Sequence, residues 1–264
     1  KEIKKDNGDI LIRFTPDSKY IIVSDGFNRL FTLVVETGEI LNKYLYSFSR
    51  INDFCITNDS KNIYALNKDS VLVWNLERGN FIKTFAIEKN TCAIDISKDN
   101  TFFITLGVEK GYGPKNIYLR KTLNGELTKT ISTKEHLEFA KLTYDNNYVV
   151  AISPDSKFIL IYDLATGDLV KKYAPVADWI YMKTKEKEDE YFLFRQGGKI
   201  FLMDHSFKRL SDFELDGNSE KMVYQKSNNK IYAELNGNIE VISPDHGEII
   251  KSLHNEKSLS ACKF

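Results

Sequence analysis

The chain has 264 residues, with 37 Lys or Arg against 37 Asp or Glu, so its formal net charge is zero. A chain of this length buries about three quarters of its unfolded surface and supports a sizeable core. The balanced charge removes the simplest argument for nucleic acid or an anionic membrane as the main partner. No stretch approaches the ~18 apolar residues that a membrane span needs.

The cysteines and the first residues indicate a compartment. Cys55, Cys92 and Cys262 are an odd number and lack metal-ligand spacing, which favours a reducing, intracellular location, cytoplasmic or nuclear. The opening KEIKKDNGD is basic, but no apolar stretch follows it. It is therefore not a secretory signal.

An acidic or Asn-containing turn followed by an apolar, aromatic run recurs along the chain. The copies are FTPDSKYIIVS (14–24), ITNDSKNIYAL (56–66), ISKDNTFFITL (96–106), LTYDNNYVVAI (142–152) and the weaker KEKEDEYFLF (185–194) and YQKSNNKIYA (224–233). Their turn residues are spaced by 40 to 46 positions. A period in this range is typical of repeat architectures.

A second, independent turn has the same period. It ends in Gly and leads into a Lys-rich segment, as in ETGEILNKY (36–44), ERGNFIKTF (77–85), LNGELTKTI (123–131), ATGDLVKKY (165–173) and DHGEIIKSL (245–253). Phe207 takes the Gly place in the fifth unit. Within a unit the residue pattern has the period of a strand, not of a helix, and four strands fit into ~40 residues.

The third strand of each unit carries a resemblance to a known family. Trp74-Asn75 in VWNLERG, Tyr162-Asp163 in IYDLATG and Met203-Asp204 in FLMDH stand where WD-repeat proteins have their Trp-Asp pair. The chain thus resembles a WD-repeat-like β-propeller over nearly its whole length, although the Gly-His pair common in that family is missing. The resemblance implies an all-β fold of four-stranded antiparallel blades that stack to bury both sheet faces.

The two recurring turns together set the predicted boundaries of the blades. We expect one β-propeller domain over 1–264, with six complete blades at about 9–48, 52–89, 92–133, 137–175, 179–216 and 220–254. Segments 1–5 and 258–264 resemble a fourth and a first strand, so they are the terminal strands of a possible seventh blade, and the chain is then a portion of a longer one. The alternative is a six-bladed ring with terminal extensions.

Few residues of the sequence suggest a catalytic or metal-binding site. Asp163 and Asp168 could form a carboxylate pair, but Glu and Asn replace Asp168 in other units, which favours a solvated turn position. The histidines lack metal-ligand spacing. The first strands ILIRF, DFCIT, AIDIS and EFAKL are mainly apolar or mixed, so no ring of inward ligands is expected. We predict no catalytic, cofactor-binding or metal-binding residues.

We therefore expect a non-catalytic protein–protein interaction scaffold that presents loop faces to partners in a larger assembly. Loop aromatics and arginines are the expected anchors, namely Arg50, Tyr112, Trp179 and Arg195. One alternative is a propeller enzyme, a hydrolase or oxidoreductase with a metal or cofactor in the central channel. A second is an RNA-associated scaffold in a ribonucleoprotein, although direct nucleic-acid binding is not expected from the neutral charge.

Overall fold

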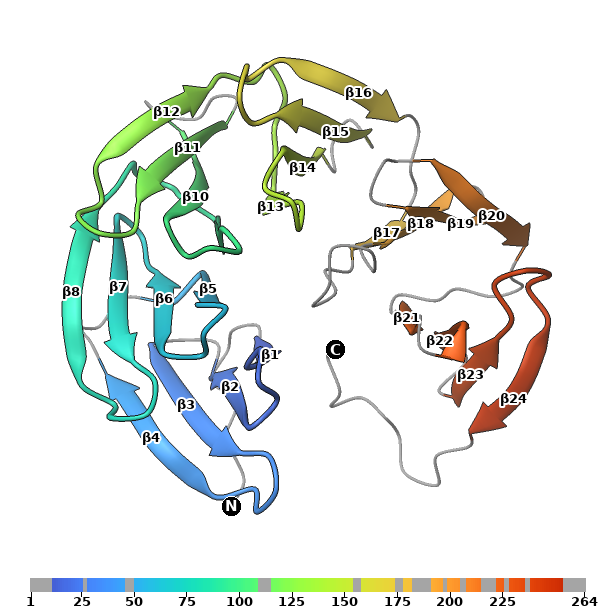
Figure 1. Ribbon diagram of the computed structural model, residues 1–264, viewed down its shortest axis with the longest axis horizontal. Coiled ribbons are helices and arrows are strands. Elements are labelled where there is room, and N and C mark those ends of the chain that lie inside the picture. Colours follow the sequence, from blue (N-terminus) through green and yellow to red (C-terminus); the bar gives the residue numbers. More distant parts are fainter. Residues whose placement is uncertain are drawn as a thin grey trace. The chain divides into compact units, whose positions relative to one another are not determined.

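A computed structural model describes most of the chain as short strands joined by tight turns (Figure 1). The described residues are 11–25, 28–45, 50–108, 115–153, 158–173, 178–181, 191–196, 199–204, 208–214, 222–225, 228–235 and 238–253. The predicted terminal strands 1–5 and 258–264 and the candidate anchor Tyr112 lie outside these ranges.

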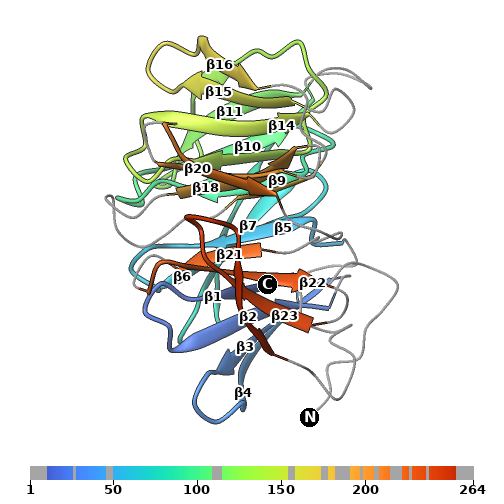
Figure 2. The same ribbon diagram turned by 90° about the vertical axis from the view of Figure 1, so that its right-hand side faces the viewer.

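The described strands form six four-stranded antiparallel sheets, which confirms the predicted all-β fold with six complete blades. Contacts divide the chain into two compact units, of which the first comprises residues 1–142, 146–156 and 160–172. Figure 2 shows the strands of blade 1 in chain order from β1 to β4.

The first unit contains nearly all of blades 1 to 4. Blade 1 is β1 (Ile12–Phe14), β2 (Tyr20–Ser24), β3 (Arg29–Val34) and β4 (Ile40–Leu45). Blade 2 is β5 (Asp53–Ile56), β6 (Asn62–Leu66), β7 (Ser70–Asn75) and β8 (Phe81–Ala86). Blade 3 is β9 (Ala93–Ile96), β10 (Phe102–Gly107), β11 (Asn116–Lys121) and β12 (Leu127–Ile131). Blade 4 is β13 (Phe139–Leu142), β14 (Tyr148–Ser153), β15 (Phe158–Asp163) and β16 (Leu169–Tyr173).

The second unit contains blades 5 and 6. Blade 5 is β17 (Asp178–Tyr181), β18 (Tyr191–Gln196), β19 (Lys199–Asp204) and β20 (Arg209–Glu214). Blade 6 is β21 (Met222–Gln225), β22 (Lys230–Leu235), β23 (Asn238–Ile242) and β24 (Ile249–Leu253). Side chains of both blades share one core cluster that includes Leu193, Phe213 and Ile231.

Strand β7 shows why a blade needs a neighbour on each side. Successive strand residues point to opposite faces, and both faces of β7 are apolar. Leu72 and Trp74 pack in a cluster with Tyr44 of blade 1, whereas Val73 packs in another with Phe103 of blade 3. Each such buried side chain stabilises the fold by about 1.5–3 kcal/mol, so stacking of blades supplies the core.

The turn between the first and second strands links successive blades within the first unit. The backbone N–H of Asn58 donates to Oδ1 of Asn100 at 2.8 Å, and that of Lys98 donates to Oδ1 of Asn146 at 3.1 Å. Asn100 and Asn146 both have φ of 59°, a left-handed conformation that Asn adopts more readily than most residues. The repeated Asp–Asn turn is thus also a contact between blades.

Blade 1 keeps this contact by moving the donor by one residue. Pro16 occupies the position of the donor and has no backbone N–H. Instead, the N–H of Asp17 donates to Oγ of Ser60 at 3.1 Å. The link between blades 1 and 2 is therefore preserved despite the proline.

A second link joins the fourth strand of one blade to the turn between the third and fourth strands of the next. Lys83 Nζ donates to the carbonyl oxygens of Thr122 at 2.8 Å and Leu123 at 2.7 Å. Lys129 Nζ makes the same pair of contacts in the following blade, to Leu164 at 3.0 Å and to the next carbonyl. The Lys-rich ends of the repeats therefore satisfy turn carbonyls that a strand end leaves unpaired.

The Gly of the same turn allows this approach. Gly125 and Gly167 have φ of 73° and 85°, the left-handed region that favours glycine. A Cβ atom at Gly125 would overlap the ring of Phe85, whereas one at Gly167 would meet Lys129 at 3.4 Å and Ile131 at 3.6 Å, both ordinary contacts. The two glycines therefore share a backbone conformation but differ in the space around them.

This difference predicts unequal effects of two matched substitutions. Gly125→Ala and Gly167→Ala should each lose about 1 kcal/mol of unfolding free energy, because alanine is strained at positive φ. Gly125→Ala should lose a further ~1–3 kcal/mol, because its methyl group overpacks against Phe85. Urea unfolding of both variants measures the difference, and equal losses would contradict this packing.

The first turn of the repeat also holds an acidic side chain by local hydrogen bonds. Asp99 Oδ1 accepts from Ser97 Oγ at 2.7 Å and from Thr101 N–H at 3.1 Å. Burial alone would raise the pKa of Asp99, but these hydrogen bonds outweigh it and lower the pKa below its usual value. The pKa values of Asp17 and Asp59 are lowered by the same balance.

A lowered folded-state pKa implies loss of stability in acid. Stability from these three carboxylates is present above the ordinary carboxyl pKa of about 3.9 and is lost as the pH falls through their lower folded values. The triple variant Asp17→Asn, Asp59→Asn, Asp99→Asn should therefore lose less stability between pH 7 and pH 2.5 than the parent. Thermal unfolding at both pH values tests this, with the exposed Asp168→Asn as the control. An unchanged pH dependence in the triple variant would refute it.

Candidate functional site

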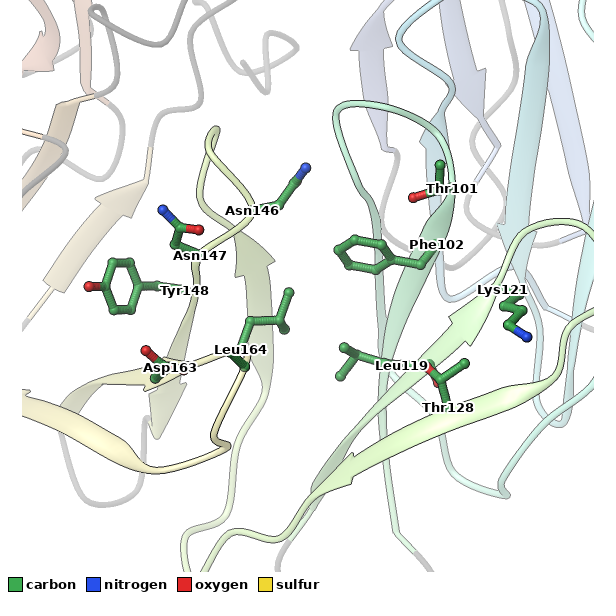
Figure 3. A pocket seen from close by; sticks show the side chains of 11 residues that line it. Thr101, Phe102, Leu119, Lys121, Thr128, Asn146, Asn147, Tyr148, Asp163 and Leu164 are labelled. Carbon is green, nitrogen blue, oxygen red and sulfur yellow. The ribbon is translucent and has the colours of Figure 1, made fainter.

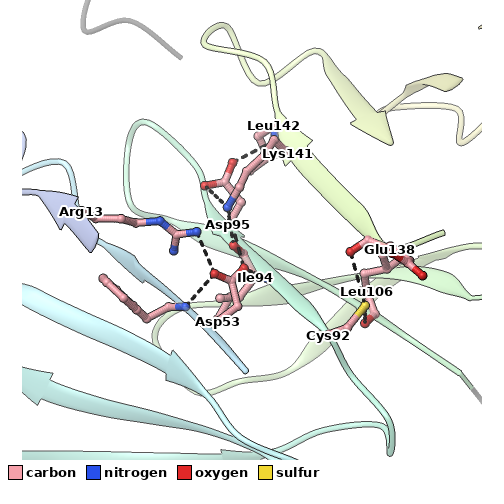
Figure 4. Close-up of polar contacts among 10 residues, drawn as sticks. Arg13, Asp53, Cys92, Ile94, Asp95, Leu106, Glu138, Lys141 and Leu142 are labelled. Atoms are coloured by element: carbon pink, nitrogen blue, oxygen red, sulfur yellow. Dashed lines mark hydrogen bonds and ion pairs between the residues drawn. The ribbon is translucent and has the colours of Figure 1, made fainter. Parts of the chain in front are cut away.

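Four charged side chains on the first strands of blades 1 to 4 form one connected network (Figure 4). Arg13 Nη2 lies 2.7 Å from Asp53 Oδ1. Lys141 Nζ lies 4.0 Å from Asp53 Oδ2 and 3.7 Å from Asp95 Oδ1, and it donates to the carbonyl oxygen of Ile94 at 2.8 Å. Two cations and two carboxylates thus neutralise one another across four blades.

Backbone amides supply further donors to both carboxylates. Asp53 accepts from the N–H of Phe54 at 2.9 Å and from the N–H of Ile94 at 3.0 Å. Asp95 Oδ2 accepts from the N–H of Leu142 at 2.9 Å. The contacts to residues 94 and 142 cross to the next blade, so each carboxylate bridges two blades. Buried carboxylates with such partners stabilise a particular arrangement of strands.

The charge states in the network are those expected of a structural contact between blades. Burial alone would lower the pKa of Arg13, but the Asp53 carboxylate outweighs burial and raises it, so the guanidinium stays charged. Cys55, on β5, lies within electrostatic reach of the same groups, and burial first, then the charge of Asp95, raises the pKa of its thiol. A protonated thiol is a poor nucleophile.

Sequence reasoning misses this network. It predicts mainly apolar or mixed first strands, yet Arg13, Asp95 and Lys141 stand at one repeat position, four residues before the turn acid of their own blades. Opposite charges recurring at one position of the repeat are a signal that reveals a link between neighbouring blades. Asp53 stands two residues earlier in its blade, which hides it from that comparison.

A hollow of about 600 Å³ lies between blades 3 and 4 (Figure 3). Phe102 and Leu119 of blade 3 line one side, and Leu164 of blade 4 lines the other. Leu119 is buried, while Phe102 and Leu164 are half-buried. The hollow lies beside the two recurring turns of the repeat, and its centre is apolar.

The charged groups at its rim are already paired. Lys121 Nζ lies 2.9 Å from Glu126 Oε2, and Asp163 Oδ1 accepts from the N–H of Thr166 at 2.8 Å. Asp163, considered from sequence as half of a carboxylate pair with Asp168, therefore caps its own turn. With one cation and one anion engaged locally, the hollow suits an uncharged, apolar side chain.

The turn residue that lines the hollow has a more deeply buried counterpart at the junction of blades 1 and 2. Where blade 1 meets blade 2, the hydroxyl of Tyr44 donates to the carbonyl oxygen of Leu76 at 2.8 Å, and Leu76 is fully buried. Blade 3 has Ile131 at the position of Tyr44. Leu164, which matches Leu76, is only partly covered.

The sequence-predicted anchors that the structure describes, Arg50, Trp179 and Arg195, do not line this hollow. Arg50 is exposed and precedes β5, at the opposite end of the blades from the turns of the hollow. Trp179 on β17 and Arg195 on β18 lie on paired strands, where Trp179 faces Phe194 in the register and Arg195 faces Asp178. Tyr112 lies outside the described residues. Their role in binding stays a prediction.

The described part of the chain shows neither a metal-binding cluster nor a membrane-spanning helix. No group of three or more His, Cys, Asp or Glu side chains is arranged there to hold a metal ion. Among the same residues, no helix has the length and apolar character that crossing a membrane requires.

Many solved structures are similar to this chain, and two of them come from different organisms. One is the Cps50 (Swd1) β-propeller domain of Myceliophteria thermophila, with a TM-score of 0.71 and 11% identity over 96% of this chain and 88% of that one. The other is hydrazine synthase of Kuenenia stuttgartiensis, with a TM-score of 0.66 and 16% identity over 88% and 76%. At these identities the likeness shows the β-propeller fold alone. No protein-family model and no curated protein sequence matches the chain.

The charge network predicts a large effect of removing one carboxylate. Asp53→Asn should lower the unfolding free energy by about 3 kcal/mol, because it leaves the buried Lys141 and the half-buried Arg13 without their shared partner. Asp69→Asn, at an exposed position in the turn between β6 and β7 of the same blade, should change it by less than about 0.5 kcal/mol. Chemical unfolding compares the two, and similar small losses would show that the network contributes little.

Proposed function

We propose that this chain is a non-catalytic, WD-repeat-like interaction module that binds another protein through the hollow between blades 3 and 4. The occupant is an uncharged, apolar side chain of that partner. The observation that carries the proposal is the combination of an apolar centre, formed by Phe102, Leu119 and Leu164, with rim charges that are paired within the chain.

The burial of one such side chain supplies enough binding free energy for a weak to moderate anchor. Burial of apolar surface contributes about 25 cal/mol per Å², so a Leu-sized or Phe-sized side chain contributes about 2 kcal/mol when fully covered. Anchors of this size in a desolvated pocket dominate many interfaces. Polar side chains around the hollow, including Thr101 and Asn147, supply the hydrated rim that such interfaces have.

The charge network supports a structural role, rather than a catalytic one, for the charged residues of the first strands. The oxygens of Asp53 and Asp95 are engaged by backbone N–H groups and by Arg13 and Lys141. A general base needs a carboxylate that reaches a substrate proton, and these carboxylates bridge blades instead. The neutral net charge further favours a protein partner over direct RNA binding, and the odd number of cysteines without metal-ligand spacing favours a reducing, intracellular setting.

Filling the hollow tests the proposal. Ala165 is exposed and lines the hollow, so Ala165→Arg should obstruct it without disturbing the core. Leu123 occupies the matching turn position of blade 3 and is 81% exposed, so Leu123→Arg adds the same charge away from the hollow. We expect Ala165→Arg, but not Leu123→Arg, to reduce recovery of a specific partner at least tenfold.

Affinity purification of the full-length protein with quantitative mass spectrometry provides the measurement, and the melting temperature of each variant verifies folding. Equal partner recovery with the parent and both variants would remove the hollow from the binding surface. Recovery of RNA that falls steeply with salt would instead favour the ribonucleoprotein alternative.

A further inference from the structure

The first unit carries an excess of negative charge at one end of its blades. In an antiparallel blade, the turn between the first and second strands and the turn between the third and fourth strands lie at the same end. We call this end the turn face and define it by residues 15–19, 35–39, 57–61, 76–80, 97–101, 122–126 and 164–168. These residues include eight Asp or Glu against four Lys or Arg, and all twelve are exposed.

The loops at the other end of the same unit show no such excess. Their described residues are 25, 28, 50–52, 67–69, 87–92, 108, 115 and 132–138, with five Asp or Glu against five Lys or Arg. The chain as a whole has a formal net charge of zero, so the acidic character belongs to one face. A face of one sign attracts oppositely charged partners and repels like-charged ones.

Several carboxylates of the turn face are held in their ionised form. Hydrogen bonds, first of all from Lys121, lower the pKa of Glu126. For Asp17, Asp59 and Asp99, burial alone would raise the pKa, but hydrogen bonds outweigh burial and lower it. The charge of the face therefore persists at neutral pH and below it.

The hollow between blades 3 and 4 opens among these turns (Figure 3). Thr101 and Ala165, which line it, belong to the turn face. Asp99 precedes Thr101 by two residues, Asp168 follows Ala165 by three, and both carboxylates are exposed. The apolar surface of the hollow thus lies within a face that favours cations, and the two features place separate requirements on an occupant.

We propose that the partner of the hollow is a basic segment: an apolar side chain fills the hollow, and Lys or Arg residues next to it face the carboxylates of the turn face. This inference rests on the proposed function and specifies the charge of the partner. Apolar burial supplies most of the affinity. The exposed charges mainly accelerate association and reject acidic segments, and their effect falls with salt.

Three capped peptides test the proposal on the full chain, namely Lys-Leu-Leu-Lys, Glu-Leu-Leu-Glu and Lys-Ser-Ser-Lys. Changes in the NMR signals of the Thr101 and Ala165 amides measure binding at the hollow. At low salt we expect Lys-Leu-Leu-Lys to have a dissociation constant at least about fivefold below those of the other two. In about 1 M salt, where the screening length is about 3 Å, its preference over Glu-Leu-Leu-Glu should disappear.

Two matched charge reversals separate the charge of the face from the net charge of the chain. Asp168→Lys changes an exposed carboxylate of the turn face, and Asp69→Lys changes an exposed one in the turn between β6 and β7, at the other end of the unit. Asp168→Lys should reduce the low-salt preference for Lys-Leu-Leu-Lys by about threefold, whereas Asp69→Lys should leave it unchanged. The melting temperature of each variant verifies folding.

Failure of this inference and failure of the proposed function give different results. Equal binding of Lys-Leu-Leu-Lys and Glu-Leu-Leu-Glu at the hollow, or equal effects of the two charge reversals, would overturn the inference and leave the hollow as a binding site. Equal binding of Lys-Leu-Leu-Lys and Lys-Ser-Ser-Lys would indicate attraction by charge alone and would also overturn it. No change at Thr101 and Ala165 with either leucine peptide would overturn both proposals.

Discussion

The fold depends on the contact between the fourth strand of one blade and the last turn of the next. A four-stranded sheet with two apolar faces is stable only when both are covered, and this contact closes the outer part of each junction. Lys83 and Lys129 satisfy the turn carbonyls, Phe85 covers the apolar surface, and Gly125 provides the space. Because the same few residues recur, one geometry serves successive junctions.

Much of this architecture is predictable from sequence because its determinants are local. The two turn motifs have strong conformational requirements, and their common period locates the blades along the chain. Hydrogen bonds within a turn also explain the polar residues at the Trp-Asp position. Asn75 Oδ1 accepts from the N–H of Arg78 at 2.7 Å, and Asp163 does the same with Thr166 at 2.8 Å. Their short polar side chains cap the turn.

The charge network is not predictable in the same way, because its meaning is not local. Asp53 lies in blade 2 and Lys141 lies in blade 4, far apart in the sequence. Each of their strands, taken alone, is a first strand of mixed polar and apolar residues and does not indicate a partner. Only the stacking of β5, β9 and β13 brings the opposite charges together. Anchor prediction by residue type meets the same limit, since the types of Arg50 and Trp179 do not indicate which turns are left uncovered. The hollow is formed instead by side chains that two blades contribute together.

A repeat protein acquires a specific site where one repeat departs from the rule that holds the others together. In blade 2 the turn residue Leu76 is fully buried and its carbonyl accepts from Tyr44, whereas in blade 4 the matching Leu164 is half-buried beside the hollow. The polar link is retained there, since Lys129 still donates to the carbonyl of Leu164. The amine therefore preserves the alignment of the blades, while the apolar side chains that line the hollow stay partly uncovered. A junction can thus gain binding capacity without losing the contact on which the stacking of blades depends.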